Sequence, residues 1–107
     1  MKNLELNFIQ RLKIINLLSL QEGTLGKTAP FKRVLDLIRF NEEEDVQIVK
    51  TQVDATTVNY AAPTDFKSLL VDIENADATA VVTLMEEWQH FTPADHVWCD
   101  PMLKALR

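Results

Sequence analysis

Cysteine, glycine and long apolar runs are all scarce in this sequence. Its one cysteine, Cys99, cannot form an internal disulfide, so we expect a reducing compartment, the cytoplasm. No apolar run approaches the ~20 residues that a membrane helix needs. Residues 1–7 show no signal-peptide pattern, and we expect no membrane partner. The 107 residues, 47% of them hydrophobic, are enough for a single domain over residues 1–107 whose core needs no disulfide or metal.

Positive charge is also scarce, and most of it lies early in the chain. Residues 1–40 have seven Lys/Arg and three Asp/Glu, which gives a net charge of +4. Residues 41–107 have four Lys/Arg and thirteen Asp/Glu, which gives a net charge of −9. An acidic chain repels polyanions, which disfavours nucleic acid as a partner. The basic part can instead meet acidic elements of the same chain, of a second copy or of another protein. Its partner-binding candidates are Arg11, Lys13, Lys32, Arg33 and Arg39.

Apolar residues at helical spacing dominate residues 7–40 and predict two helices. The first helix is expected to begin after Asn7, with Gln10 completing a capping box, and to end near residue 20 with Gly23 as its C-cap. Thr28 is expected to cap the second helix, with Pro30 in its first turn. Residues 21–27 then form a loop. Its Gly-Lys-Thr sequence lacks the spacing of a phosphate-binding loop, which favours an ordinary connection.

From residue 46 the spacing of the apolar residues changes to the period of two that is typical of strands, and from about residue 75 it returns to helical spacing. An acidic helical turn is predicted at residues 42–46, with Asn41 as its cap. Strands are predicted at 46–54 and 66–74, pairing antiparallel, and residues 56–60 either continue the first strand or form another. A helix then starts at Asn75 or Asp77 and ends near residue 91. Short helical pieces follow the capping signals before Pro93 and Pro101.

These elements predict an α+β fold. We expect an N-terminal helix pair, an antiparallel β-hairpin unit and a C-terminal helix with short terminal helical segments. Because a hairpin alone is marginal in water, the helices should cover one of its faces. The other face is then free for solvent or for another chain.

A pattern of apolar spacing with one loop runs through about the first 45 residues: Arg11-Leu12, Ile14, Leu17-Leu18, Glu22-Gly23, Phe31-Lys32 to Leu37, and Phe40-Asn41-Glu42-Glu43-Glu44. This pattern resembles one in small uncharacterised proteins of tailed bacteriophages and prophages. Ser19 and Leu20 stand where such relatives have a proline before the loop. The resemblance implies a phage-encoded protein that acts in the host cytoplasm or in a virion, and it implies no activity and no catalytic residues.

The residues most typical of a reactive site are His90, His96 and Cys99, which have acidic neighbours. Imidazole, thiolate and carboxylate are zinc-type ligands, so these three residues are weak metal candidates. A structural zinc site needs four ligands, usually from paired cysteines, and this chain has one cysteine. Cys99 with His96 as its base also lacks a third group or an oxyanion donor. We therefore predict no catalytic residue, no metal and no cofactor.

Two tryptophans, Trp88 and Trp98, flank the proline at residue 93. They can anchor an interface, or they can close the core under the terminal helix. We expect a non-enzymatic interaction or accessory protein that binds a protein partner or associates with itself. The alternatives are a winged-helix-like nucleic-acid-binding regulator, which the acids at 42–45 oppose, and a small metal-dependent enzyme.

Overall fold

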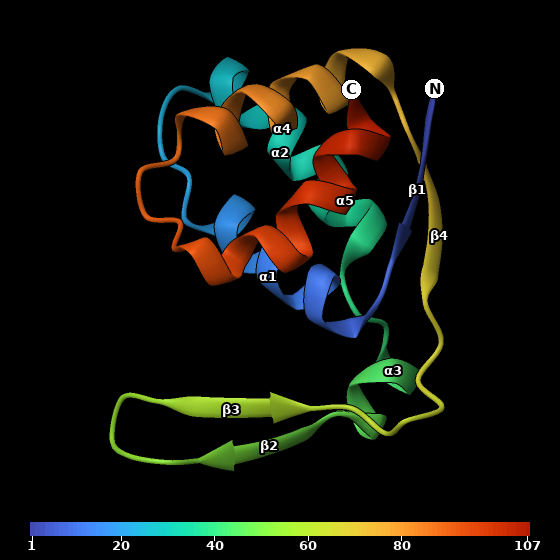
Figure 1. Cartoon of the computed structure of the whole chain (residues 1–107), viewed down its shortest axis with the longest axis vertical. Coiled ribbons are helices and arrows are strands. Elements are labelled where there is room, and N and C mark those ends of the chain that lie inside the picture. Colours follow the sequence, from blue (N-terminus) through green and yellow to red (C-terminus); the bar gives the residue numbers. More distant parts are fainter.

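Five α-helices and two separate two-stranded sheets make up the structure, a computed structural model that describes all 107 residues (Figure 1). The predicted α+β class is confirmed. In chain order the elements are β1 (Lys2–Leu6), α1 (Phe8–Ser19), α2 (Leu25–Ile38), α3 (Glu42–Gln47), β2 (Val49–Gln52), β3 (Val58–Ala61), β4 (Leu69–Ile73), α4 (Asn75–Glu87), the 3-10 helix η1 (Pro93–Asp95) and α5 (His96–Leu106).

The strand pairing differs from the prediction. The strand at 46–54 was expected to pair with 66–74, but β2 pairs with β3, and β4 pairs antiparallel with β1 at the start of the chain. The reason is burial. Leu4 and Leu6 of β1 are 4% and 0% exposed, and they lie opposite Val71 and Leu69 of β4. Because β1 offers an apolar face with period two and β2 has no buried residue, β4 gains more from pairing with β1.

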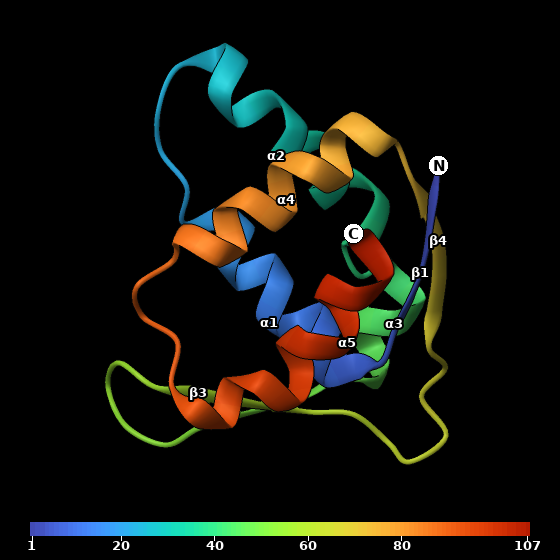
Figure 2. The ribbon, with the colours of Figure 1, turned by 45° about the horizontal axis from the view of Figure 1, so that its top comes forward.

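The core lies between four helices and the β1–β4 sheet. Helix α5 contacts β1, α1 and α4, and α2 packs on α4. Helix α5 lies against α1, α4 and β1 (Figure 2), with Trp98, Cys99, Met102 and Leu106 buried and the opposite side of the helix exposed. The last helix of the chain therefore closes one side of the core. The buried apolar residues that form the core cluster are Leu4, Leu6, Ile14, Leu17, Leu18, Phe31, Val34, Leu35, Ile38, Ile73, Ala78, Val81, Met85, Trp98, Cys99, Met102 and Leu106.

The first two helices show one confirmed cap and two corrections. Asn7 and Gln10 form the predicted capping box of α1. Gly23 is not its C-cap: the helix ends at Leu20, and Gly23 lies in the loop with a left-handed φ of 154°. Thr24, not Thr28, caps α2, because its hydroxyl accepts a hydrogen bond from the Lys27 amide at 3.2 Å. Pro30 therefore lies inside α2, where it removes one helical hydrogen bond.

The C-terminal helices also differ from the predicted boundaries. Helix α4 is preceded by Glu74 and ends at Glu87, and Asp77 is a buried ion-pair partner instead of a cap. The predicted break at Pro101 does not occur, since α5 continues through it. Trp98 and Met102 are buried on either side of this proline. Packing of one continuous apolar face therefore outweighs the hydrogen bond that the proline loses.

The pairing of β1 with β4 predicts the effect of a substitution in β1. Leu6→Ala should lower the free energy of unfolding by ~2–5 kcal/mol, because it empties a fully buried site. The control is Leu70→Ala on the outer face of β4, where the side chain is 76% exposed and the change should stay within ~0.5 kcal/mol. Urea denaturation of the two variants measures both values, and equal effects would contradict the β1–β4 pairing.

Candidate functional site

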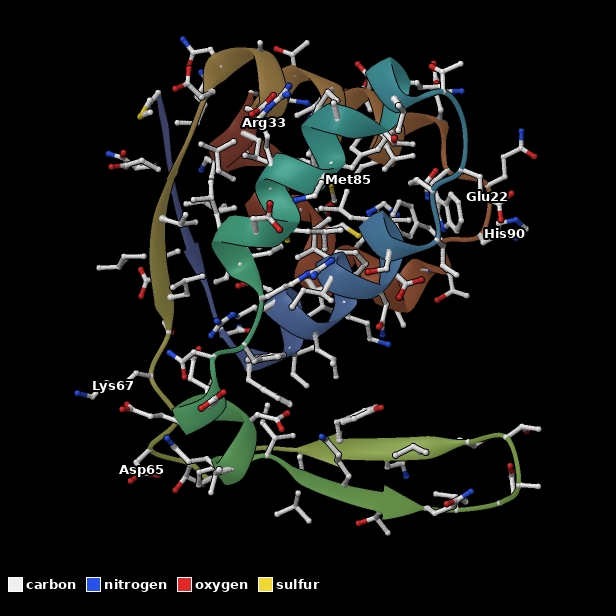
Figure 3. The ribbon with its side chains drawn as sticks, turned by 180° about the vertical axis from the view of Figure 1, so that it is seen from behind. Glu22, Arg33, Asp65, Lys67, Met85 and His90 are labelled. Carbon is white, nitrogen blue, oxygen red and sulfur yellow. The ribbon has the colours of Figure 1, made fainter.

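The β2–β3 hairpin reaches away from the helices and is covered by none of them (Figures 1 and 3). All eight residues of the two strands are exposed. Val49 and Val53 are 60% and 59% exposed, and Val58 and Tyr60 are 39% and 41% exposed. Since a two-stranded hairpin by itself is only marginally stable in water, this hairpin presents apolar side chains and backbone edges that the chain itself leaves unused.

The two faces of the hairpin differ in character. Antiparallel pairing sets Val49 opposite Ala61 and Thr51 opposite Asn59, so Val49, Thr51 and Val53 share one face. We call this the valine face. The other face carries Lys50, which lies opposite Tyr60 and whose ammonium group is 3.2 Å from the Asp45 carboxylate of α3. The valine face is therefore uncharged, with two valines and Ala61 beside the polar Thr51 and Asn59, and the opposite face has an aromatic ring and an ion pair.

Helix α3, which directly precedes the hairpin, is held to the other helices by Arg11, a cation that is only 2% exposed. Its Nε donates to the Ile38 carbonyl at 2.6 Å, and Nη2 donates to the Arg39 carbonyl at 2.8 Å. Both guanidinium Nη atoms also bind the Glu44 carboxylate, with Nη2–Oε1 at 2.8 Å. The carbonyls belong to the end of α2, where the helix dipole favours a cation. One side chain of α1 thus caps α2 and holds α3.

Glu44 has two functions at this point. It is the third residue of α3 and accepts a hydrogen bond from the Asn41 amide at 3.1 Å, while the Asn41 side chain accepts one from the Glu44 amide at 2.8 Å. Asn41 is therefore the cap that the sequence predicts, and Glu44 completes a capping box with it. The same carboxylate binds Arg11, and this hydrogen bonding lowers the pKa of Glu44 below its ordinary value. The cap of α3 and the contact with α1 therefore depend on one ionised group.

Three phenylalanine rings lie beside this ion pair. The centroids of Phe8 and Phe40 are 5.6 Å apart, and Phe66 lies 5.4 Å from Phe8 and 6.0 Å from Phe40. The Arg11 guanidinium carbon lies 4.3 Å from the centre of the Phe40 ring, a cation–π distance. These five residues, Arg11, Glu44, Phe8, Phe40 and Phe66, are called the joint below. They join α1, the end of α2, α3 and the segment between β3 and β4.

The basic partner-binding candidates are mostly engaged within the chain. Arg11 is buried in the joint and cannot be a surface contact. Arg33 binds the buried Asp77 of α4 through three hydrogen bonds of 2.8 to 3.1 Å. Lys32 pairs with Asp36 on its own helix at 2.7 Å. The side chains of Lys13 and Arg39 remain exposed.

The tryptophans lie on the body and not on the hairpin. Trp98 is 7% exposed, which removes it from the surface candidates, and its indole nitrogen donates to Asp95 at 3.1 Å. Trp88 is half-buried against the core, with the His90 ring 5.1 Å away. The aromatic residues at this corner therefore mainly close the core.

The three metal candidates are not brought together. His90 packs on Trp88, and His96 bonds Asp100 at 2.9 Å through Nδ1. Cys99 is buried, and burial raises the pKa of its thiol to about 11, with smaller contributions from Asp95 and Asp100. A thiol with this pKa is protonated at neutral pH, which is opposite to the thiolate that a ligand or nucleophile needs.

Helix α3 is the element that a winged-helix interpretation would place against DNA. It has six residues, none of them buried, and its first turn contains Glu42, Glu43, Glu44 and Asp45. Arg11 neutralises only Glu44 among these carboxylates. The exposed end of α3 is therefore acidic and would repel phosphates.

Neither the exposed hairpin nor the joint is predicted by a local sequence pattern. The sequence pattern predicts Arg11 as a surface cation, although its helical neighbours three residues away on either side, Phe8 and Ile14, are apolar. Phe8, Phe40 and Phe66 are far apart in the sequence, and no local pattern pairs them. The alternation in β2 was recognised, but nothing in it shows that both faces stay exposed.

Comparison of the chain with protein-family models, with curated proteins and with solved structures gives no significant match. None of its helices has both the length and the apolar character that crossing a membrane requires. The hairpin and the joint are therefore the features of the chain that point to a function.

The joint makes a quantitative prediction. Arg11→Met keeps much of the side-chain volume but leaves Glu44 and two carbonyls without their donor, so it should lower the free energy of unfolding by about 3 kcal/mol. Lys13→Met changes an exposed cation two residues away and should cost less than ~0.5 kcal/mol. Urea denaturation at neutral pH compares the two variants. A similar loss in both would mean that Arg11 does not hold the structure together.

Proposed function

We propose that this protein is a non-enzymatic interaction protein and that the β2–β3 hairpin is its protein-binding element. The observation that carries the proposal is the exposure of every residue of both strands, on a hairpin that follows a helix held to the body by the Arg11–Glu44 ion pair. A hairpin that contributed only to stability would be expected to pack one face on the core. This one is held at its base while its apolar residues meet solvent, as in a recognition element.

The charge pattern of the hairpin supports the same proposal. Residues 55–64 form the longest uncharged stretch of the chain, ten residues, and they include all of β3. Exposed strands of monomeric proteins usually carry lysine, proline or a bulge that prevents pairing with another chain. The absence of charge from β3 is therefore better explained by contact with a protein than by permanent exposure.

We further propose that the protein is an accessory protein of phage type, acting in the host cytoplasm or in a virion. The support for this is the resemblance of the N-terminal 45 residues to proteins of tailed bacteriophages and prophages. A small α+β protein with an uncovered hairpin is suited to binding and positioning another protein.

Site-specific photo-cross-linking tests the hairpin as the binding element. A photoreactive phenylalanine analogue at position 53 on the valine face should give covalent adducts with protein chains, both in bacterial cells and with purified protein. The same analogue at Leu25 is the control, because that side chain is 90% exposed on a helix of the body. Adducts at position 25 and none at position 53 would overturn the proposed function.

A further inference from the structure

We infer that the hairpin binds a second copy of this chain, by antiparallel pairing of β2 with β2 of the other copy about Thr51. This inference rests on the proposed function and names its partner. In Figures 1 and 3, β3 lies between β2 and the helices. The outer edge of β2 therefore faces away from the body, and a second hairpin can approach it without meeting the helices of the first copy.

The backbone of β2 has its free hydrogen-bonding groups on that edge. The Val53 amide donates to the Thr57 carbonyl at 3.0 Å, so the amide and carbonyl groups of Val53, Thr51 and Val49 point toward β3. Because these groups alternate along an antiparallel strand, those of Lys50 and Gln52 point outward. The edge thus offers two residues with unused donors and acceptors.

The sequence of β2 is nearly symmetric about Thr51 in residue type: Val49-Lys50-Thr51-Gln52-Val53. An antiparallel pair centred on Thr51 sets Lys50 opposite Gln52 of the second copy, and these are the residues with outward groups. About four backbone hydrogen bonds then join the copies. On the valine face, Val49 meets Val53 of the second copy, and the two threonines meet at the centre. Pairs of β-branched residues in these positions stabilise a sheet.

Charge selects this register over its neighbour. Moving the pairing by two residues toward the start of β2 would set Lys50 opposite the Lys50 of the second copy, which is unfavourable. Centred on Thr51, Lys50 instead lies opposite the uncharged Gln52 of the second copy, and the two Lys50 side chains are only diagonal to each other. Each Lys50 also keeps the Asp45 carboxylate of its own chain at 3.2 Å, which offsets its positive charge at the contact.

The size of the contact sets the strength of the dimer. An edge of this length, with two valine pairs, covers less than the ~800 Å² per partner that is typical of a tight complex. The product is a four-stranded sheet in a dimer that forms and dissociates at micromolar concentrations. Four strands are also in the range where a sheet becomes stable, which two strands do not reach.

Sedimentation velocity over a concentration series tests the pairing. The wild-type protein should shift from monomer to dimer as its concentration rises. Thr51→Lys and Thr51→Glu each place like charges at the centre of the contact and should weaken association at least tenfold, whereas an equimolar mixture of the two should restore it. Asn59→Lys is the matched control: it adds the same charge to the valine face one strand away from the edge, and it should dimerise more strongly than Thr51→Lys.

Amide hydrogen exchange gives a second readout on the wild-type protein. The Thr51 and Val53 amides are bonded within the hairpin at every concentration, but those of Lys50 and Gln52 should gain protection only as the dimer forms. A protein that stays monomeric to ~1 mM would overturn the inference. If the analogue at position 53 still cross-links to a different protein, the proposed function stands; if it cross-links to nothing, both fail.

Discussion

The structure depends on one buried cation. Arg11 is almost inaccessible to solvent, and its guanidinium group meets two carbonyls at the end of α2, the carboxylate of Glu44 and the ring of Phe40. A buried charge is stable only when every donor has an acceptor, and here the acceptors come from different elements. The Arg11 side chain thus joins α1, the end of α2 and α3, and the hairpin follows directly after α3.

This arrangement separates stability from recognition. The helices and the β1–β4 sheet share a core in which Leu6, Ile38 and Ala78 are fully buried, and that core needs nothing from the hairpin. The hairpin in turn contributes no strand residue to the core. Its sequence is therefore free of packing constraints and can serve contact with another chain. The Arg11–Glu44 ion pair holds α3, the helix that precedes the hairpin. Holding this helix reduces the conformational entropy that the hairpin loses when it binds another chain.

Local features were predictable from the sequence, and long-range contacts were not. The capping box at Asn7, the cap at Asn41 and the alternation of β4 follow from short patterns, and each appears as expected. The pairing of β4 with β1 depends on a comparison of buried area between distant segments. The continuation of α5 through Pro101 likewise depends on packing that outweighs a local signal. The burial of Arg11 could not be derived, because its acceptors lie 27 to 33 residues away.

Residual dipolar couplings of backbone amides, measured on the weakly aligned protein at monomeric concentration, show whether the joint fixes the hairpin to the helical body. In the wild type, one alignment tensor should fit the amides of α1, α2 and the β2–β3 hairpin together. In Arg11→Met the hairpin couplings should shrink and no longer fit the tensor of the helices. A wild-type hairpin that already reorients independently of the helices would contradict the account.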